Sequence, residues 1–350
     1  MKNVLKMFIV VDLQLLANLN TNVTTANTTG NNLTAEMKTF YDMTLIDEAG
    51  PALVHDQFGQ KRPIPANGGK KIEFRKFNPL PKALTALTEG VTPDGGKLDV
   101  SKLEAEVSQY GYYIVQSDVL ELTAIDNTIV EATKMLGRQA GLTLDTITRN
   151  KLMAGTNVMY CPKIASGGTE TPVTSRANLD ATAQLTVDVV NQVVAKLRAK
   201  NAPTINGDYV AIIHPFVAYD LMRDPAWLDA HKYTTSENIY AGEIGKIGGV
   251  RFVQTSEAKI YTGSADNCPS GLAVFATLFL ADGAYGVTEI SGGGLQTIVK
   301  QKGSAGTADP LDQRSSIGWK AMKTAEILVE PYMVRVESCS ARFSASAQAN

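Results

Sequence analysis

The sequence predicts an α+β fold, and three segments with different periodicities support that class. Within residues 58–116 apolar residues alternate with polar or charged ones, which is the period of a half-exposed β-strand. Over 118–155 apolar residues recur every three or four positions, as in an amphipathic helix. From 186 to 338 helical stretches and short apolar strands follow one another, so both element types build the rest of the chain.

Composition bounds the class of protein. The 350 residues are 44% hydrophobic and 19% charged, with a formal net charge of -2. Such a chain can bury a sizeable core, and its charge argues against binding nucleic acid by neutralising phosphates over the whole surface. The three cysteines, Cys161, Cys268 and Cys339, form no CxxC pair. Reduced thiols are therefore expected, and neither a disulfide framework nor a zinc ribbon.

Residues 18–34 are expected to form an extended arm. Twelve of the seventeen residues 18–34 are Asn or Thr, so this stretch has little apolar surface to bury. A short helix is expected over 35–52. Asp12 interrupts the apolar run 7–11, so a signal peptide is not expected. No stretch reaches the ~20 apolar residues of a membrane span, and we expect a soluble protein made inside the cell.

A long hairpin is expected within 58–116. KKIEFRKF (70–77) reads as one strand, a Pro- and Gly-rich stretch (78–96) cannot be regular structure, and 97–116 returns as strand. The tip offers few residues for a core of its own. A hairpin of this length therefore needs another surface to lie against.

The same hairpin carries a basic run between residues 61 and 82, opposed in that stretch by Glu73 alone. Its cations are Lys61, Arg62, Lys70, Lys71, Arg75, Lys76 and Lys82. We expect this run to contact an acidic protein surface, and the alternative is a solvated strand face. Nucleic acid is disfavoured, because only Phe74 and Phe77 interleave with the cations.

The remaining elements follow from periodicity and punctuation. A helix is predicted over 118–155, where Asp126 can cap a second start and Gly155 marks the end. A second helix is predicted over 186–200, a strand over 208–214 and a short helix over 215–224. Further strands are predicted in GGVRFVQT, LAVFATLFLA, AYGVTEI, GLQTIVKQ and the later part of 317–338.

The stretch GEIGKIGG (242–249) is the best candidate for a nucleotide loop, but its spacing is wrong. A phosphate-binding loop requires glycine where Tyr240 stands and a hydroxyl residue where Ile247 stands. No GxGxxG, HExxH or GxSxG motif occurs either, and His214 reads as a histidine at a strand end. The sequence therefore predicts no catalytic residue, no metal site and no cofactor.

Several short stretches together resemble the major capsid proteins of tailed phages, which have the Hong Kong 97 fold. The likeness is to the branch typified by a Podovirus with a virion RNA polymerase. The stretches that carry it are FRKFNPLP (74–81), LTEGVTPDG (87–95), QYG (109–111), GLTLD (141–145), LMAGTN (152–157), IHP (213–215), GEIGKIGGVRFVQT (242–255) and DPLDQRSSIGWK (309–320).

This resemblance implies a division of the chain. Residues 1–55 would be the N-terminal arm, and 56–112 the extended loop that reaches over a neighbouring subunit. A peripheral domain would comprise 113–180 and 301–350, with 118–155 as its spine helix, and 181–300 would form the axial domain. Hexamers and pentamers would close into an icosahedral shell around phage DNA.

The expected partners are other copies of the chain, a separate scaffolding protein and a portal, with packaged DNA nearby but not specifically bound. Assembly would occur in the host cytoplasm and the product would be the virion, with no membrane partner. The residues expected at contacts between subunits are Lys70, Lys71, Arg75, Lys76, Lys82, Gly242, Glu243 and Gly245. An encapsulin-like compartment and a glycine-loop ligand-binding enzyme are the alternatives.

Overall fold

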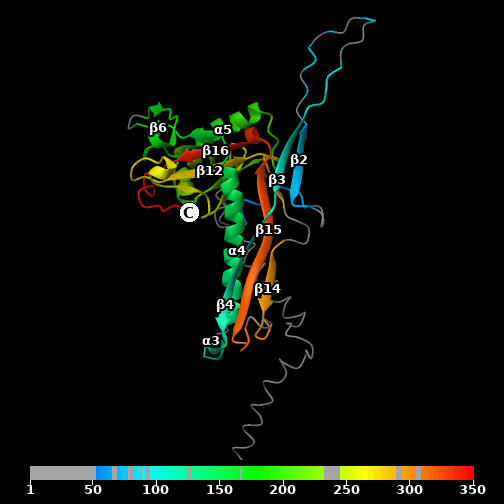
Figure 1. The fold of residues 1–350 in the computed structure, drawn as a ribbon. Helices are drawn as coiled ribbons and strands as arrows, with labels where there is room; N and C mark the ends of the chain where they lie inside the picture. The colour runs from blue at the N-terminus through cyan, green and yellow to red at the C-terminus, as the bar shows by residue number, and fades with distance from the viewer. Residues whose placement is uncertain are drawn as a thin grey trace, which may run out of the picture. The chain divides into compact units, whose positions relative to one another are not determined.

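The computed structural model describes residues 53–64, 69–77, 80, 82–84, 86, 89–90, 95–123, 128–165, 168–231, 245–288, 294–304 and 309–350 (Figure 1). The predicted arm and its helix over 35–52 lie outside these residues. The described chain forms two compact units. Unit 1 comprises Tyr110–Gly141 and Leu295–Ala321, and unit 2 comprises 53–109, Leu142–Gly294 and Met322–Asn350.

Unit 1 is a three-stranded sheet backed by a helix. Strand β15 (Arg314–Ile327) lies between β4 (Ser108–Ser117) and β14 (Gln296–Lys300), and it runs antiparallel to β14. Trp319 of β15 is buried, and its ring N–H donates to the Gln139 side chain of helix α4 at 2.7 Å. This contact places the helix against the face of the sheet that carries Trp319.

The long helix predicted over 118–155 is present as two elements. Helix α3 covers Asp118–Thr123 and α4 covers Thr128–Met153, so α4 ends just before Gly155 as predicted. Asp126, the predicted second cap, lies outside the described residues. The predicted inward stripe is confirmed in its middle part, because Thr133, Leu136, Ala140 and Leu144 are all buried.

Unit 2 is built on a mixed sheet of seven described strands. Its order is β5 (Val158–Tyr160), β16 (Met333–Ser338), β12 (Val274–Leu280), β8 (Tyr209–Ile213), β10 (Val250–Gln254) and β9 (Lys246–Ile247), with β11 (Ile260–Tyr261) beside β12. Strand β8 is parallel to β10 and antiparallel to β12. Every residue of β8 and β12 is buried, which explains why their sequences are almost continuously apolar.

Helix α5 (Val187–Ala199) supplies much of the core that covers this sheet. Thr186 caps it by accepting a hydrogen bond from the Val189 N–H, and its valines are buried. Helices α6 (Pro215–Met222) and α7 (Pro225–His231) follow β8. The helix predicted over 186–200, the strand over 208–214 and the helix over 215–224 are thereby confirmed.

Unit 2 also contains smaller pairings. Strand β1 (Gln60–Lys61) is parallel to β13 (Tyr285–Thr288), and β13 is antiparallel to the end of β15. Strands β2 (Lys71–Phe77) and β3 (Val100–Glu106) form a separate hairpin, and β6 (Lys163–Ile164) pairs with β7 (Glu170–Thr171). Single 3-10 turns occupy 176–178, 264–266 and 330–332.

A buried polar cluster fixes the start of the described chain inside unit 2. The main-chain N–H and ring Nδ1 of His55 meet the two carboxylate oxygens of Asp145 at 2.7 and 2.6 Å. The next residue, Asp56, accepts from Thr148 at 2.6 Å and pairs with Lys323. Two consecutive side chains are thus tied to α4 and β15.

Among the helices of the described residues, none is long and apolar enough to cross a membrane.

Candidate assembly surface

The β2–β3 hairpin has two chemically different faces because its register is regular. Ile72 lies opposite Ala105 and Phe74 opposite Leu103, so apolar residues share one face. Phe74 and Ala105 are buried. A Cβ added to Gly286 would lie 3.0 Å from the Phe74 ring, so a glycine there lets the ring approach β13 closely. The apolar face therefore anchors the hairpin to the body of unit 2.

The other face of the hairpin is charged and exposed. The register sets Lys71 opposite Glu106, Glu73 opposite Glu104, and Arg75 opposite Lys102. The side chains of Lys71, Arg75, Lys102 and Glu104 are 66%, 65%, 62% and 65% exposed, against 31% for Glu73. We call these six residues the charged face. The charged face carries three cations and three carboxylates, so its charges balance. The residues that β2 contributes, taken by themselves, are basic.

Ion pairs within the charged face centre on Glu73. Its Oε1 accepts from Arg75 Nε at 2.8 Å and lies 3.3 Å from Lys102 Nζ, while Lys71 and Glu104 are 3.9 Å apart. The hydrogen bond from Arg75, with a smaller contribution from Lys102, lowers the pKa of the Glu73 carboxyl below its usual range. Glu73 thus stays ionised at neutral pH.

The structure groups some of the residues predicted at contacts and separates others. Lys71 and Arg75 lie together on the charged face, and Lys70 directly precedes β2. Lys76 lies opposite Ser101, at a position of β2 that alternates with those of the charged face. Lys82 is exposed beyond the strand. Gly245 has a φ of 109°, and Gly242 and Glu243 lie outside the described residues.

Sequence reasoning missed Lys102, Glu104 and Glu106 as members of this surface. A signal was present, because charged residues alternate with apolar ones in VSKLEAE (100–106) just as they do in β2. Pairing the two alternations as a hairpin would have set the glutamates against the basic run. The prediction of a basic run counted opposing carboxylates only between residues 61 and 82, so it found Glu73 and covered only the first strand of the hairpin.

Beyond the paired strands, the loop exposes large apolar side chains. Leu80, Leu84 and Leu98 are 61%, 86% and 70% exposed. Such residues are normally buried, so a cluster of them on one loop indicates a surface that another protein covers.

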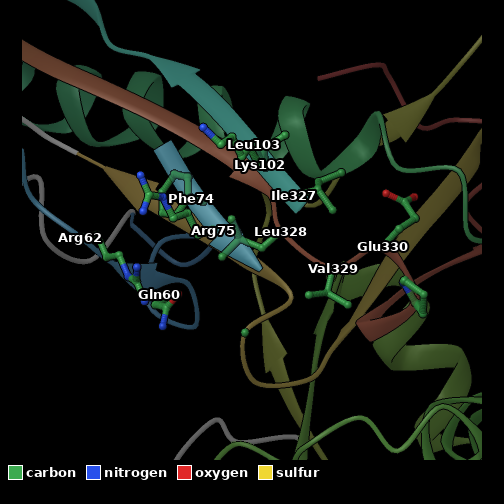
Figure 2. A pocket seen from close by; sticks show the side chains of 12 residues that line it. Gln60, Arg62, Phe74, Arg75, Lys102, Leu103, Ile327, Leu328, Val329 and Glu330 are labelled. Carbon is green, nitrogen blue, oxygen red and sulfur yellow. The ribbon is translucent and has the colours of Figure 1, made fainter. Parts of the chain in front are cut away.

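A hollow of about 470 Å³ lies at the base of the hairpin (Figure 2). Phe74 and Leu103 line it from the hairpin, and Ile327, Leu328 and Val329 line it from the chain that follows β15. Glu330 at its edge is already engaged, since its carboxylate accepts from the Asn157 N–H at 3.2 Å and from Thr156. Arg62, Arg75 and Lys102 line it as well, so the hollow combines apolar and basic side chains.

Unit 1 presents a second exposed surface on its sheet. Tyr113 and Val115 of β4 are 69% and 49% exposed, and Ile298 of β14 is 39% exposed. Gly318 of β15 lies between these strands, where an added Cβ would come within 2.7 Å of the Tyr113 Cβ. Exposed aromatic and β-branched side chains on a sheet are typical of an interface.

The glycine-rich stretch serves a tight turn. Strands β9 and β10 pair as an antiparallel hairpin joined by Gly248 and Gly249, whose φ angles are 61° and 81°. Positive φ at both central residues is the requirement of a type I′ turn, which explains the two glycines. Lys246 pairs with Asp208 at 2.6 Å and is 59% exposed. It is a surface charge beside a turn.

The histidines and cysteines have structural surroundings. His214 caps α6, because its Nδ1 accepts from the Phe216 N–H at 3.2 Å. Cys161 and Cys339 are buried, and burial raises the pKa of both thiols, for Cys339 to about 12. Across the described part of the chain, no group of three or more His, Cys, Asp or Glu side chains is arranged to hold a metal ion.

Comparison with known proteins matches residues 68–301, more than half of the chain, to a family described as phage capsid protein. No curated protein matches. Among solved structures, the capsid of Ralstonia phage GP4 has a TM-score of 0.61 at 14% identity, over 81% of this chain and 87% of that chain. The cyanophage Pam1 capsid has a TM-score of 0.60 at 14% identity, over 91% and 97%. The head of Helicobacter pylori bacteriophage KHP40 has a TM-score of 0.59 at 12% identity, over 79% and 88%. At these identities the structures show a shared fold.

Proposed function

The chain belongs to the phage capsid protein family, and from that premise we propose that its copies assemble as hexamers and pentamers into an icosahedral shell around phage DNA. Membership of this family establishes that the chain is a structural protein of the capsid shell. The observation that carries the finer proposal is the hairpin. It exposes apolar side chains that its own chain leaves uncovered within the described residues, as an assembling subunit requires.

We propose the division of the chain that its resemblance to tailed-phage capsid proteins implies. We assign residues 1–55 to an arm, 56–112 to an extended loop, 113–180 and 301–350 to a peripheral domain, and 181–300 to an axial domain. The exposed leucines of the loop and the exposed residues of the unit 1 sheet support this assignment, because both need a partner surface. Contacts between many identical copies would cover them.

The partners we propose are mainly other copies of this chain. A separate scaffolding protein and a portal complete the set, and packaged DNA lies against the shell without specific contacts. Assembly takes place in the host cytoplasm, and the assembled product is the virion. The role is structural, with no enzymatic step.

Electron microscopy tests the proposal directly. The purified chain is examined by negative stain, alone and together with a phage lysate that supplies scaffolding proteins. Closed shells with six-fold and five-fold clusters support the proposal. A compact monomer under every assembly condition, absent from virions, contradicts it.

An encapsulin-like compartment would share this fold, so the contents of the particles separate the two. Phage DNA inside particles purified from lysate supports the capsid role, and an enzyme cargo contradicts it. The ligand-binding alternative is tested by nucleotide binding to the unassembled chain. Binding that Lys246→Ala abolishes would favour it, whereas the surface pairing of Lys246 with Asp208 favours its absence.

A further inference from the structure

We propose that the charged face of the β2–β3 hairpin is a self-complementary contact between two copies of this chain related by a two-fold axis. This inference rests on the proposed assembly of copies into a shell. It states that the charged faces of two copies contact each other in that shell. The partner of the basic residues is then the acidic half of the same face on another copy.

The charges on this face are ordered in rows. Glu73 and Glu104 form an acidic row across the two strands, and Arg75 and Lys102 form the basic row beside it. Because neighbouring rows are two residues apart along each strand, their separation is about 7 Å. One acidic row and one basic row are thus neighbours, and the third row, Lys71 opposite Glu106, carries one charge of each sign.

This order favours one relative orientation of two copies. If two such faces meet about a two-fold axis that passes between the rows, the acidic row of each copy lies on the basic row of the other. If the faces meet in the same direction, like charges oppose one another at both rows, which is repulsive. The face therefore favours antiparallel strands in the two copies and disfavours parallel ones.

The ion pairs within one hairpin leave the side chains of the charged face able to contact a second copy. Arg75, Lys102 and Glu104 remain more than half exposed, and Glu104 lies 3.9 Å from Lys71 Nζ. A guanidinium has five donors and an ammonium three, and Glu73 alone takes up few of them. The opposite face carries the buried Phe74 and Ala105, so the charged face is the more exposed of the two, although Arg75 and Lys102 also line the hollow at the base of the hairpin.

The contact is small and acts together with others. A few charged side chains bury far less than the ~800 Å² per partner of a stable pair, so this face does not hold two isolated chains together. Its effect is on orientation, since matched charges steer encounter and reject wrong registers. Assembly, where many weak contacts act at once, is where it becomes measurable.

Charge reversal and mixing test the proposal. One variant, Arg75→Glu/Lys102→Glu, makes the face wholly acidic at these rows, and a second, Glu73→Lys/Glu104→Lys, makes it wholly basic. Each alone is expected to form at least tenfold fewer shells than the wild-type chain by negative stain. An equimolar mixture is expected to recover at least half of the wild-type yield, because unlike faces then meet across the two-fold axis.

Mixing separates contacts between copies from pairs within one hairpin. In the mixture every hairpin still lacks its internal pairs, so recovery reports only the contact between copies. Normal shells from either variant alone, or no recovery on mixing, would overturn the proposal. Lys196→Glu/Lys200→Glu, on exposed positions around the end of α5, is the matched control and should leave the yield unchanged. If the wild-type chain forms no shells, the shell function itself is wrong.

Discussion

Glu337 is a fully buried carboxylate held between two arginines of unit 2. Arg176 donates to both of its oxygens at 2.6 Å, and Arg335 donates to Oε1 at 3.0 Å. Burial by itself lowers the pKa of Arg176, but the hydrogen bond and charge of Glu337 outweigh it and raise that pKa above its usual value. Arg335 also donates to the Gly155 main-chain oxygen at 3.2 Å, which ties the end of α4 to β16.

Neutralising this carboxylate should destabilise unit 2. Glu337→Gln leaves the buried Arg335 and the half-buried Arg176 without their counter-charge, so we expect a loss of about 3–5 kcal/mol in the free energy of unfolding. Chemical denaturation of the unassembled chain measures it. Glu326→Gln is the matched control, because Glu326 pairs with Lys151 at an exposed position and its loss should cost no more than about 1 kcal/mol. Equal losses for the two variants would contradict the explanation.

A pH dependence follows from His214. Burial lowers the pKa of this ring to about 4 from an ordinary value near 6.5, so the ring is neutral in the folded chain. The unfolded chain binds the proton more tightly, so the stability that His214 contributes is complete above pH ~6.5 and is lost as pH falls towards 4. Protonation also removes the acceptor that caps α6.

Replacement of His214 by asparagine tests this dependence. Asn keeps an acceptor at the N-cap but has no titrating ring. We expect the Tm of His214→Asn to fall less between pH 7 and pH 5 than that of the wild-type chain, measured on unassembled protein. Parallel Tm profiles for the two chains would show that other groups govern acid sensitivity.

At the scale of elements, β4 and β15 can pair closely because glycines stand where other residues would collide. A Cβ on Gly318 would lie 2.7 Å from the Tyr113 Cβ and 2.8 Å from the Tyr112 main-chain oxygen. The backbone there has nowhere to move without breaking the ladder. Gly318→Ala should therefore destabilise the chain by about 1–3 kcal/mol.

The signature of that change should be local as well as global. Hydrogen exchange should rise in β4 and in the first half of β15, and little in β8 or β12. Gly95→Ala is the control, because an added Cβ at Gly95 meets nothing within 4 Å. Unchanged exchange in β4 for Gly318→Ala would mean that the strands accommodate the methyl group.

The elements were largely predictable, and their long-range partners were not. The alternation in β2, the valine-rich face of α5 and the apolar runs of β8 and β12 each determine an element locally, and all were predicted. The pairing of His55 with Asp145 joins residues 90 positions apart, and Arg176 with Glu337 joins residues 161 apart. No local periodicity carries such partners. The charged face was half predicted for the same reason, because β3 supplies Lys102 and two of the three glutamates.

At the scale of the whole molecule, the family and the Hong Kong 97-type fold predicted from scattered motifs are confirmed by the family match and the solved capsid structures. The motifs did this because they occur in the right order over a long span, although each is short. What they could not give is which side chains meet between copies. That depends on how hairpin faces and sheet faces are exposed, which only the register and burial reveal.

The hairpin loop should be dispensable for folding and required for assembly. Phe77 pairs with Val100, so replacing residues 78–99 by Asn-Gly closes β2 and β3 with a two-residue turn while the register is kept. The removed stretch contains the exposed Leu80, Leu84 and Leu98, and Phe74 and Ala105 keep the remaining hairpin anchored. Circular dichroism and Tm of the unassembled variant should therefore match the wild-type chain, while negative stain should show no closed shells. Shells of normal yield would mean that the leucines of the loop are not covered by a neighbour. A large fall in Tm would mean instead that the loop belongs to the core of its own chain.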